Sequence, residues 1–541
     1  MKKYFPILSL FFLLIFQQVQ AQKKRDSLQS QTVTITRSYT PTVGDADKIQ
    51  VNPPVTVSED FRKIPLQYRP LELEAVSTFL TEKGKSKKPS VSFERYAASP
   101  GFAELAVGNQ KALRLRGWYL YRLENDWKIG GGLSYETLGQ TATDTLLLTA
   151  FSNLESLLTA QKNTGLADWR IQAGYNRYGS AYRDTLQPFS RVAEPLAVHN
   201  IYAGLKSDFH RTVFKKIRFR YDYSSLDNFS GNDIALRNTN IFPVGGFDIA
   251  TVLSANYTGG QNGTVSYNNF QAGLFPSLRL DRERFHFKLG LKLFYQNRTD
   301  MNDRFLFYPD IAVNYDMVYE LLSIYLNYEG DLRTVSYKNL WQENRYVLPS
   351  TALVPTSTPY HFYGGFRGQI GSRLAYDLQL GLTKENNKPL LHERFSPRGL
   401  GLNIIYDNVE YYYFRTNLSY VVPRFFETKI NFDYYQYSPE TQAKAWNLPD
   451  YKLAWLMRFR IGKFTWGNEL YYYAPRLDKL NLLVPVKAGD FLSANLRLGY
   501  QAGKNLHIYV EGNNLLNRNY QMYYAYPVHG LHILAGASYT F

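Results

Sequence analysis

The sequence predicts an all-β protein: a transmembrane antiparallel β-barrel of about 22 strands, within a range of about 16 to 22, preceded by an extended periplasmic N-terminal tail. Three observations predict it. The chain starts like an exported protein, residues from Phe102 onward alternate between apolar and polar over long runs, and tyrosine is abundant. No later apolar run is long enough for a membrane-spanning helix, so strands would have to cross the membrane.

Residues 1–21 have the three parts of a secretory signal peptide. Lys2 and Lys3 form a basic start, an apolar stretch follows, and small residues at Val19 and Ala21 occupy the positions that signal peptidase requires. The apolar stretch is shorter than the roughly 20 residues that span a bilayer. We therefore expect cleavage after Ala21; an uncleaved anchor helix is the alternative.

Composition narrows the class further. The 541 residues include 45 tyrosines and 34 phenylalanines, a density typical of the aromatic girdles of membrane barrels. Cysteine is absent, which excludes disulfides, cysteine nucleophiles and cysteine-ligated metals. The formal net charge of +16 would suit nucleic acid, but an exported protein rarely meets it. Outer-membrane lipid with its lipopolysaccharide phosphates, or an anionic solute, is the expected partner, and a solvated basic surface is the alternative.

Residues 22–94 form the predicted tail. They contain six prolines and a lysine run between Lys83 and Lys88, without the apolar pattern of a packed domain. An extended periplasmic segment is the interpretation, and it contains no full plug. Residues 95–541 form the predicted outer-membrane β-barrel.

The barrel domain shows a strict period of two. From Phe285 to Gln296 the odd positions are aromatic or aliphatic, and the even ones are mostly polar. The same alternation appears at 216–223, 322–329, 452–461, 492–500 and 531–541. One face would contact lipid and the other would be wet. Runs of ten or more residues exceed the 5–6 typical of a soluble β-sandwich strand, so length favours the barrel.

Connections between these runs are short on one side and long on the other. The short ones lie at 281–283, 371–373, 422–423 and 503–504, and the long ones at 334–360, 474–489 and 513–530. Bacterial barrels have short periplasmic turns and long outer loops. The segments 146–158 and 233–242 are weakly patterned, and without them the count falls to between about 16 and 20. The aromatic runs 411–414 and 471–473 are predicted to lie near strand ends at headgroup level.

The last 40 residues resemble the C-terminal end of TonB-dependent receptors. Asn514-Leu515 is followed by Tyr520, Pro527, Gly530 and a final strand that ends on an aromatic residue. The resemblance implies that Tyr539 and Phe541 are recognised by the barrel-assembly machinery. The arginine that often follows the family's glycine is replaced by Leu531.

The tail carries a second resemblance. The segment Thr32-Val33-Thr34-Ile35-Thr36 looks like a TonB box, which would bind TonB or another periplasmic protein by strand addition. An ordinary tail without that role is the alternative. The stretch from Ser38 to Pro53 resembles plugless barrel proteins common in Bacteroidetes. Only about 60 residues separate the box from the barrel, too few for the family's plug, so the resemblance supports the barrel better than energised uptake.

The predicted lumen face is rich in cations. Such side chains favour anions in a water-filled pore, and pairing with lumen or tail carboxylates is the alternative. The predicted basic residues are Arg114, Arg116, Arg122, Lys216, Arg218, Arg220, Lys288, Lys292, Arg458, Arg460 and Arg497.

No catalytic or cofactor motif appears, so neither an enzyme nor a cofactor is predicted. Three functions follow. The first is a plugless receptor-like barrel in the outer membrane that passes or binds an unknown, anionic small solute, with the tail as partial gate. The second is a structural or assembly component that docks periplasmic partners through its tail. The third, an outer-membrane enzyme, would need a histidine, a carboxylate and a hydroxyl brought together from separate strands.

Overall fold

The computed structural model describes residues 100–139, 147–184, 196–263, 265–344, 346–396, 399–480, 484–518, 521–523 and 526–541. The predicted signal peptide, the tail and its TonB-box-like segment lie outside these residues. Among the described residues, no helix is long and apolar enough to cross a membrane.

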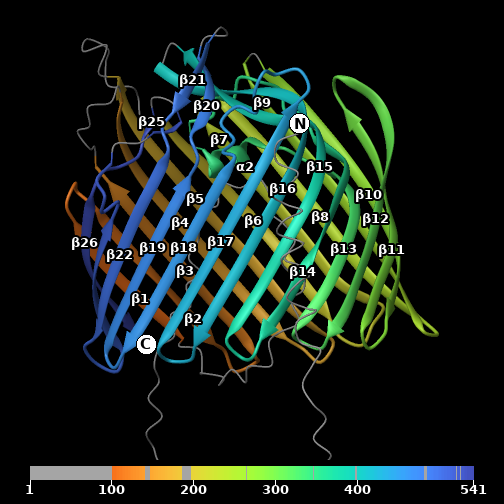
Figure 1. Cartoon of the computed structure of the whole chain (residues 1–541), viewed down its shortest axis with the longest axis horizontal. Helices are drawn as coiled ribbons and strands as arrows, with labels where there is room; N and C mark the ends of the chain where they lie inside the picture. Colours follow the sequence, from red (N-terminus) through yellow and green to blue (C-terminus); the bar gives the residue numbers. More distant parts are fainter. Residues whose placement is uncertain are drawn as a thin grey trace, which may run out of the picture. The chain divides into compact units, whose positions relative to one another are not determined.

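A single sheet of 22 antiparallel strands dominates the described chain, and it closes because the first strand pairs with the last. The strands tilt around the barrel wall (Figure 1). Their bounds in the first half are β1 Gly101–Gly108, β2 Leu113–Arg122, β3 Trp127–Leu138, β4 Leu147–Asn163, β5 Ala167–Asp184, β6 Leu196–Phe209, β7 Phe214–Leu226, β8 Phe229–Val244, β9 Phe247–Asn262, β10 Val265–Asp281 and β11 Phe285–Arg298.

The second half continues the same up-and-down order, and two small hairpins are inserted outside the barrel sheet. Its barrel strands are β12 Met301–Val318, β13 Leu322–Arg333, β14 Thr356–Ile370, β15 Leu374–Ser396, β16 Gly399–Val422, β17 Phe426–Pro439, β18 Tyr451–Ile461, β19 Phe464–Tyr473, β22 Phe491–Gln501, β23 Leu506–Asn513 and β26 His532–Thr540. The hairpins are β20 Arg476–Leu480 with β21 Val484–Ala488, and β24 Gln521–Tyr523 with β25 Tyr526–Pro527. The predicted barrel and its upper strand number are confirmed, because the weakly patterned segments form β4 and β8.

The two ends of the barrel differ in their connections. The turns at 282–284, 371–373, 423–425 and 502–505 share one end with Phe541, whose N–H donates to the carbonyl of Gly101 at 2.9 Å. The longest connections, 334–355, 474–490 and 514–531, lie at the other end. Figure 1 shows the C-terminus at the short-turn end. By the asymmetry of bacterial barrels, the short-turn end is periplasmic and the long-loop end is extracellular.

The outer face of the wall is apolar. Alternate residues along the strands are exposed large hydrophobics, and the opposite parity carries the polar groups, as the pleat of a strand requires. Ten examples, between 43% and 63% exposed, are Leu105, Leu115, Ile201, Leu253, Leu289, Leu326, Leu380, Ile461, Leu498 and Ile508. An exposed band of this kind around a closed barrel faces lipid.

The seam between β1 and β26 is closed by a lumenal cluster. Ala106, Leu138, Tyr509 and Leu534 are buried together there. The Tyr509 hydroxyl donates to Glu104 at 2.6 Å. A Cβ on Gly536 would lie 2.6 Å from the Cβ of Ala106, so only glycine allows this close packing of the two strands.

Candidate functional site

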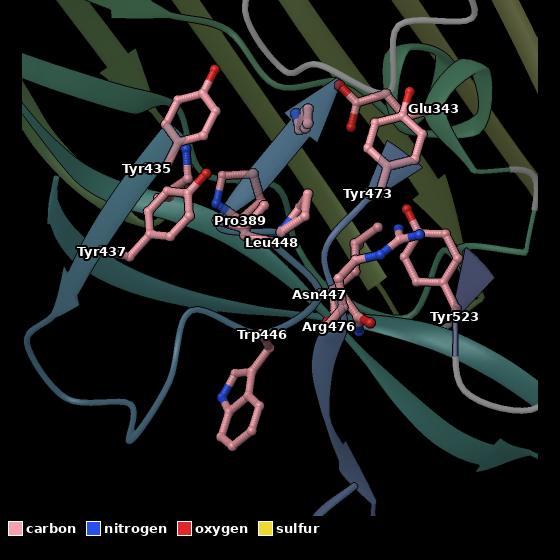
Figure 2. Close-up of a pocket in the computed structure, with 14 residues that line it drawn as sticks. Glu343, Pro389, Tyr435, Tyr437, Trp446, Asn447, Leu448, Tyr473, Arg476 and Tyr523 are labelled. Atoms are coloured by element: carbon pink, nitrogen blue, oxygen red, sulfur yellow. Dashed lines mark hydrogen bonds between the residues drawn. The ribbon is translucent and has the colours of Figure 1, made fainter. Parts of the chain in front are cut away.

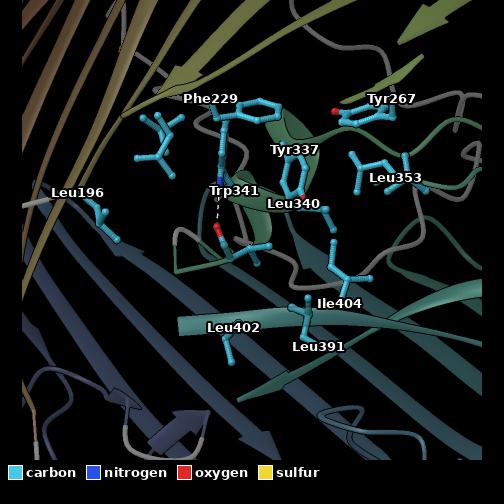
Figure 3. Packing of buried hydrophobic residues seen from close by; sticks show 14 of the residues in the cluster. Leu196, Phe229, Tyr267, Tyr337, Leu340, Trp341, Leu353, Leu391, Leu402 and Ile404 are labelled. Atoms are coloured by element: carbon cyan, nitrogen blue, oxygen red, sulfur yellow. Dashed lines mark hydrogen bonds between the residues drawn. The ribbon is translucent and has the colours of Figure 1, made fainter. Parts of the chain in front are cut away.

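The connection between β13 and β14 folds into the lumen; we call residues 334–355 the lumenal strap. It contains the short helix α2, Tyr337–Glu343, whose first turn is capped by Ser336, the hydroxyl of which accepts from the N–H of Asn339 at 3.3 Å. Tyr337, Leu340 and Trp341 are buried on one face of α2. Figure 3 shows these side chains packed inside the wall of strands. The strap is therefore a packed element and not a free surface loop.

The strap contacts the barrel wall in two places, and the first is the wall from β7 to β10. The ring of Phe229 packs edge-on against Tyr337 and Trp341, with centroids 4.9 and 5.5 Å apart. The Lys338 ammonium lies 3.0 Å from the buried carboxylate of Asp222 on β7. The amide of Asn262, at the end of β9, donates to a strap carbonyl at 2.8 Å. Aromatic packing and a charge pair thus hold α2 against this wall.

The other contact lies on β16. Val347 forms a parallel bridge with Leu402, and backbone bonds join Leu348 to Leu402 at 2.8 Å and Leu402 to Tyr346 at 3.0 Å. The N–H of Val354 donates to the hydroxyl of Tyr406 at 3.0 Å. Leu402 is fully buried beneath the strap. Since β7 and β16 are separate parts of the ring, the strap crosses the long-loop end of the lumen.

A cavity of about 50 Å³ lies beside the strap. Its wall combines aromatic rings with three cations and one carboxylate from α2, β15, β17, β18, β19, the 440–450 connection and both hairpins (Figure 2). The lining residues are Glu343, Lys388, Pro389, Leu391, Tyr435, Tyr437, Trp446, Asn447, Leu448, Pro449, Lys452, Tyr473, Arg476 and Tyr523. The lining combines apolar surface with a few converging charges, as in small-molecule sites, around a space on the scale of a few water molecules or one small ion.

Arg476 is almost fully enclosed in this pocket, with 3% of its surface exposed. Its guanidinium lies over the rings of Tyr473 and Tyr523, 5.9 and 5.5 Å from their centroids. Burial lowers the pKa of Arg476, but an arginine still carries its charge at neutral pH. Stacking on the faces of two rings supplies the attraction that offsets part of this desolvation.

Glu343 brings the one carboxylate of the pocket, from the last residue of α2. Burial raises the pKa of Glu343, and the charges of Arg333, Lys388 and Lys452 oppose that rise. The strap and the pocket therefore share a titratable group. Any change that moves α2 also changes the charge balance of the pocket.

A row of tyrosines lies next to the pocket inside the barrel. Tyr411, Tyr413 and Tyr435 are buried there with Tyr437 packed against them. The prediction that the runs 411–414 and 471–473 lie at headgroup level is wrong for their alternate members, because the pleat turns Tyr411, Tyr413, Tyr471 and Tyr473 inward. Tyr412, of the opposite parity, is 54% exposed on the outer face.

Most of the predicted basic residues lie beside carboxylates. At the seam Arg114 contacts Glu136 and Glu511, both at 2.9 Å, and Arg116 contacts Glu136 at 2.9 Å. The other pairs are Arg122 with Asp126 (2.9 Å), Arg220 with Asp222 (2.7 Å), Lys288 with Asp310, Lys292 with Glu329 (3.3 Å), Arg458 with Glu427 (3.9 Å) and Arg497 with Glu511 (3.5 Å). Arg460 lies on β18 and Lys216 and Arg218 on β7. These cations form separate groups around the wall, with carboxylates set between them.

Sequence reasoning missed the strap and the pocket. Arg476, Trp446 and Tyr523 lie in the long connections, where no periodic pattern assigns a side chain to the lumen. The one available signal for the strap, Arg476 and Tyr523 was the length of the connections 334–360, 474–489 and 513–530, which is unusual for structureless loops in a compact domain. Of the predicted terminal aromatics, Tyr539 lies on the lipid face of β26 and is 46% exposed, and Phe541 directly follows the strand and is 53% exposed.

No protein-family model matches the chain, and a search of curated proteins finds no relative. Solved structures do match. The FrpB iron transporter from Neisseria meningitidis has a TM-score of 0.64 at 9% identity, over 82% of this chain and 81% of that one. The copper transporter OprC has a TM-score of 0.61 at 12% identity, over 82% and 83%. The siderophore receptor PiuA from Acinetobacter baumannii has a TM-score of 0.61 at 10% identity, over 82% and 81%.

At these identities the likeness is one of fold. The three neighbours are named as transporters or a receptor, and a further match is the ferripyoverdine receptor of the outer membrane of Pseudomonas aeruginosa, at 14% identity. The closed barrel of 22 strands, with its apolar outer face, thus has the fold of these outer-membrane barrels.

Proposed function

We propose that the protein is a TonB-dependent-receptor-like barrel that binds a small anionic solute at its extracellular end and passes it through the lumen. The observation that carries the proposal is the pocket beside the lumenal strap. Its lining brings Lys452 and Arg476 together with the carboxylate of Glu343 and with Lys388, which is paired with Glu385, within a wall of tyrosines. A site with this charge excess attracts anions, and its rings supply apolar contact.

Uptake through the outer membrane is the function that the fold favours. Neighbours of this fold are named for the transport of copper or iron and for the reception of siderophores. We carry over to this chain only the class of activity, recognition of a small solute from outside the cell. The anionic character of the solute rests on the lumen cations of this chain.

The tail supplies the proposed periplasmic part. Residues 22–94 would act as a partial gate in place of a full plug, and the segment Thr32–Thr36 would bind TonB or a similar protein by adding a strand. Tyr539 and Phe541 would be recognised by the barrel-assembly machinery, and the basic surface would contact lipopolysaccharide. These assignments rest on the sequence.

Single-channel conductance in planar bilayers tests the proposal. We would compare the intact mature protein with a variant that lacks Gln22 to Glu94 and with one whose strap residues Tyr337 and Trp341 are both alanine. The proposal predicts an anion-selective conductance that grows when the tail is removed and grows again when the strap is loosened. Absence of conductance in all three forms would mean a filled barrel, and would instead favour a structural role in which the tail docks a periplasmic partner.

A further inference from the structure

Four cations face one another across four neighbouring strands of the barrel wall. The register pairs Arg170 on β5 with Lys206 on β6, Lys206 with Arg218 on β7, and Arg218 with Arg237 on β8. We call these four residues the basic row. Sequence analysis identified only Arg218, because the register of four strands is needed to bring the others beside it.

All four side chains lie on the lumen face. Their neighbours in sequence, Ile171, Phe219 and Leu236, are exposed apolar residues of the outer face, 48%, 39% and 44% exposed. Successive residues of a strand point to opposite faces. The basic row is therefore directed into the barrel, and its four side chains are exposed there.

The row lacks carboxylate partners. Within the described ranges, none of the four side chains forms an ion pair within 4.0 Å. Two residues nearer the short-turn end, the register pairs Asp168 with Asp208 and Asp208 with Lys216. Two residues nearer the long-loop end, the cation on β7 is Arg220, which already contacts Asp222.

Directly opposed like charges destabilise a sheet pair. Elsewhere in the lumen this chain sets carboxylates beside its cations, as at Arg114 and Lys292. Four adjacent cations without such partners are therefore a feature that the fold itself does not need. A ligand that is present during function would remove the repulsion.

Resting on the function proposed above, we propose that the basic row binds an elongated polyanion, a solute with several phosphate or carboxylate groups in line. Neighbouring strands lie about 4.8 Å apart, so four cations extend over roughly 14 Å. A single small anion would contact two of them at most. The row lies below the contact between Lys338 and Asp222, four residues along β7 from Arg218, so it follows the strap on the way to the periplasm.

Binding of inorganic tripolyphosphate and of orthophosphate to the full-length protein in detergent, measured by titration calorimetry at several salt concentrations, tests this assignment. Tripolyphosphate should bind more tightly than orthophosphate. The variant R170Q/K206Q/R218Q/R237Q should lose at least tenfold in its affinity for tripolyphosphate and have a weaker salt dependence. The matched control R282Q/R284Q/R373Q/R424Q, which removes four charges from turns at the short-turn end, should keep the wild-type affinity.

Two results would overturn the proposal. One is an unchanged tripolyphosphate affinity in the row variant, with the folded barrel confirmed by its circular dichroism. The other is weak binding by the wild type that becomes strong in D45N/D47N/E59Q/D60N, which would assign the row to the carboxylates of this chain's own tail. The titration measures binding and does not depend on transport. If the barrel conducted nothing, the proposed transport function would be wrong, but the titration would still show whether the basic row binds a polyanion.

Discussion

Loosening the lumenal strap should open the barrel without unfolding it, and Trp341→Ala is the substitution that tests this. Trp341 is 3% exposed, its ring packs on Phe229, and its indole N–H donates to the carbonyl of Val347 at 2.8 Å. Truncation of a buried tryptophan to alanine costs about 3–5 kcal/mol. The cost falls on the strap, because the hydrogen bonds of the 22 strands do not involve this residue.

That free energy predicts the size of the effect. At about 1.4 kcal/mol for each factor of ten, the equilibrium between docked and undocked strap shifts by roughly a hundredfold to a few thousandfold. Hydrogen exchange measured by mass spectrometry should show a loss of protection of that order in peptides from 334–355. Peptides from the strands on the opposite wall, such as β2 and β3, should keep their protection.

Trp466→Ala provides the control. Trp466 is 49% exposed on the outer face and does not contact the strap, so its removal should leave the exchange of residues 334–355 as in the wild type. Equal protection of the strap in Trp341→Ala and wild type would refute the reasoning, since the strap would then be held by its backbone bonds to β16 alone. Loss of protection throughout the barrel would also refute it, because the cost of the substitution would then fall on the strands and not on the strap alone.

Three further changes test other parts of the molecule. Arg114→Ala leaves Glu511 buried without its closest partner, which should lower the stability of the barrel by about 3–5 kcal/mol. The folded band on semi-native gels should then disappear at a lower temperature, and an unchanged temperature would contradict this prediction. Burial raises the pKa of Glu343, so strap stability should be greatest below pH 4.5 and fall as pH rises through the raised pKa. Exchange protection corrected for intrinsic rates should show this fall in the wild type and not in Glu343→Gln. Alanine at both Tyr539 and Phe541 should reduce the folded barrel recovered in outer-membrane fractions, and an undiminished yield would remove their assembly role.

The barrel could be predicted because its signal is local and repeated. Every strand must present apolar side chains to lipid at alternate positions, so a run such as 285–296 carries the evidence for its own structure. The weak segment 233–242 illustrates the limit. On β8, Asn238 and Asn240 occupy the parity that carries Leu236 and Phe242, so polar residues interrupt the outward face and weaken the alternation.

The candidate site could not be predicted in the same way. The strap reaches the lumen through contacts between α2 and strands more than 60 residues away in sequence, as in the packing of Tyr337 on Phe229 and Tyr267. Such contacts leave no period in the sequence. The lumen face of single strands was predictable from alternation, but the partners of each cation depend on register, which is a property of strand pairs.

Register therefore separates two roles for lumen cations. Arg114 lies between Glu136 and Glu511, on strands either side of the seam, and its charge contributes to closure of the barrel. The basic row has the opposite arrangement. Each adjacent pair of like charges, about 5 Å apart in a water-filled lumen, repels by roughly 1 kcal/mol before salt screening, or roughly 3 kcal/mol over the row. Neutralising the row should therefore stabilise the empty barrel while it weakens polyanion binding. A structural cation would show the reverse, and this opposition of stability and binding is what distinguishes a ligand site from a part of the wall.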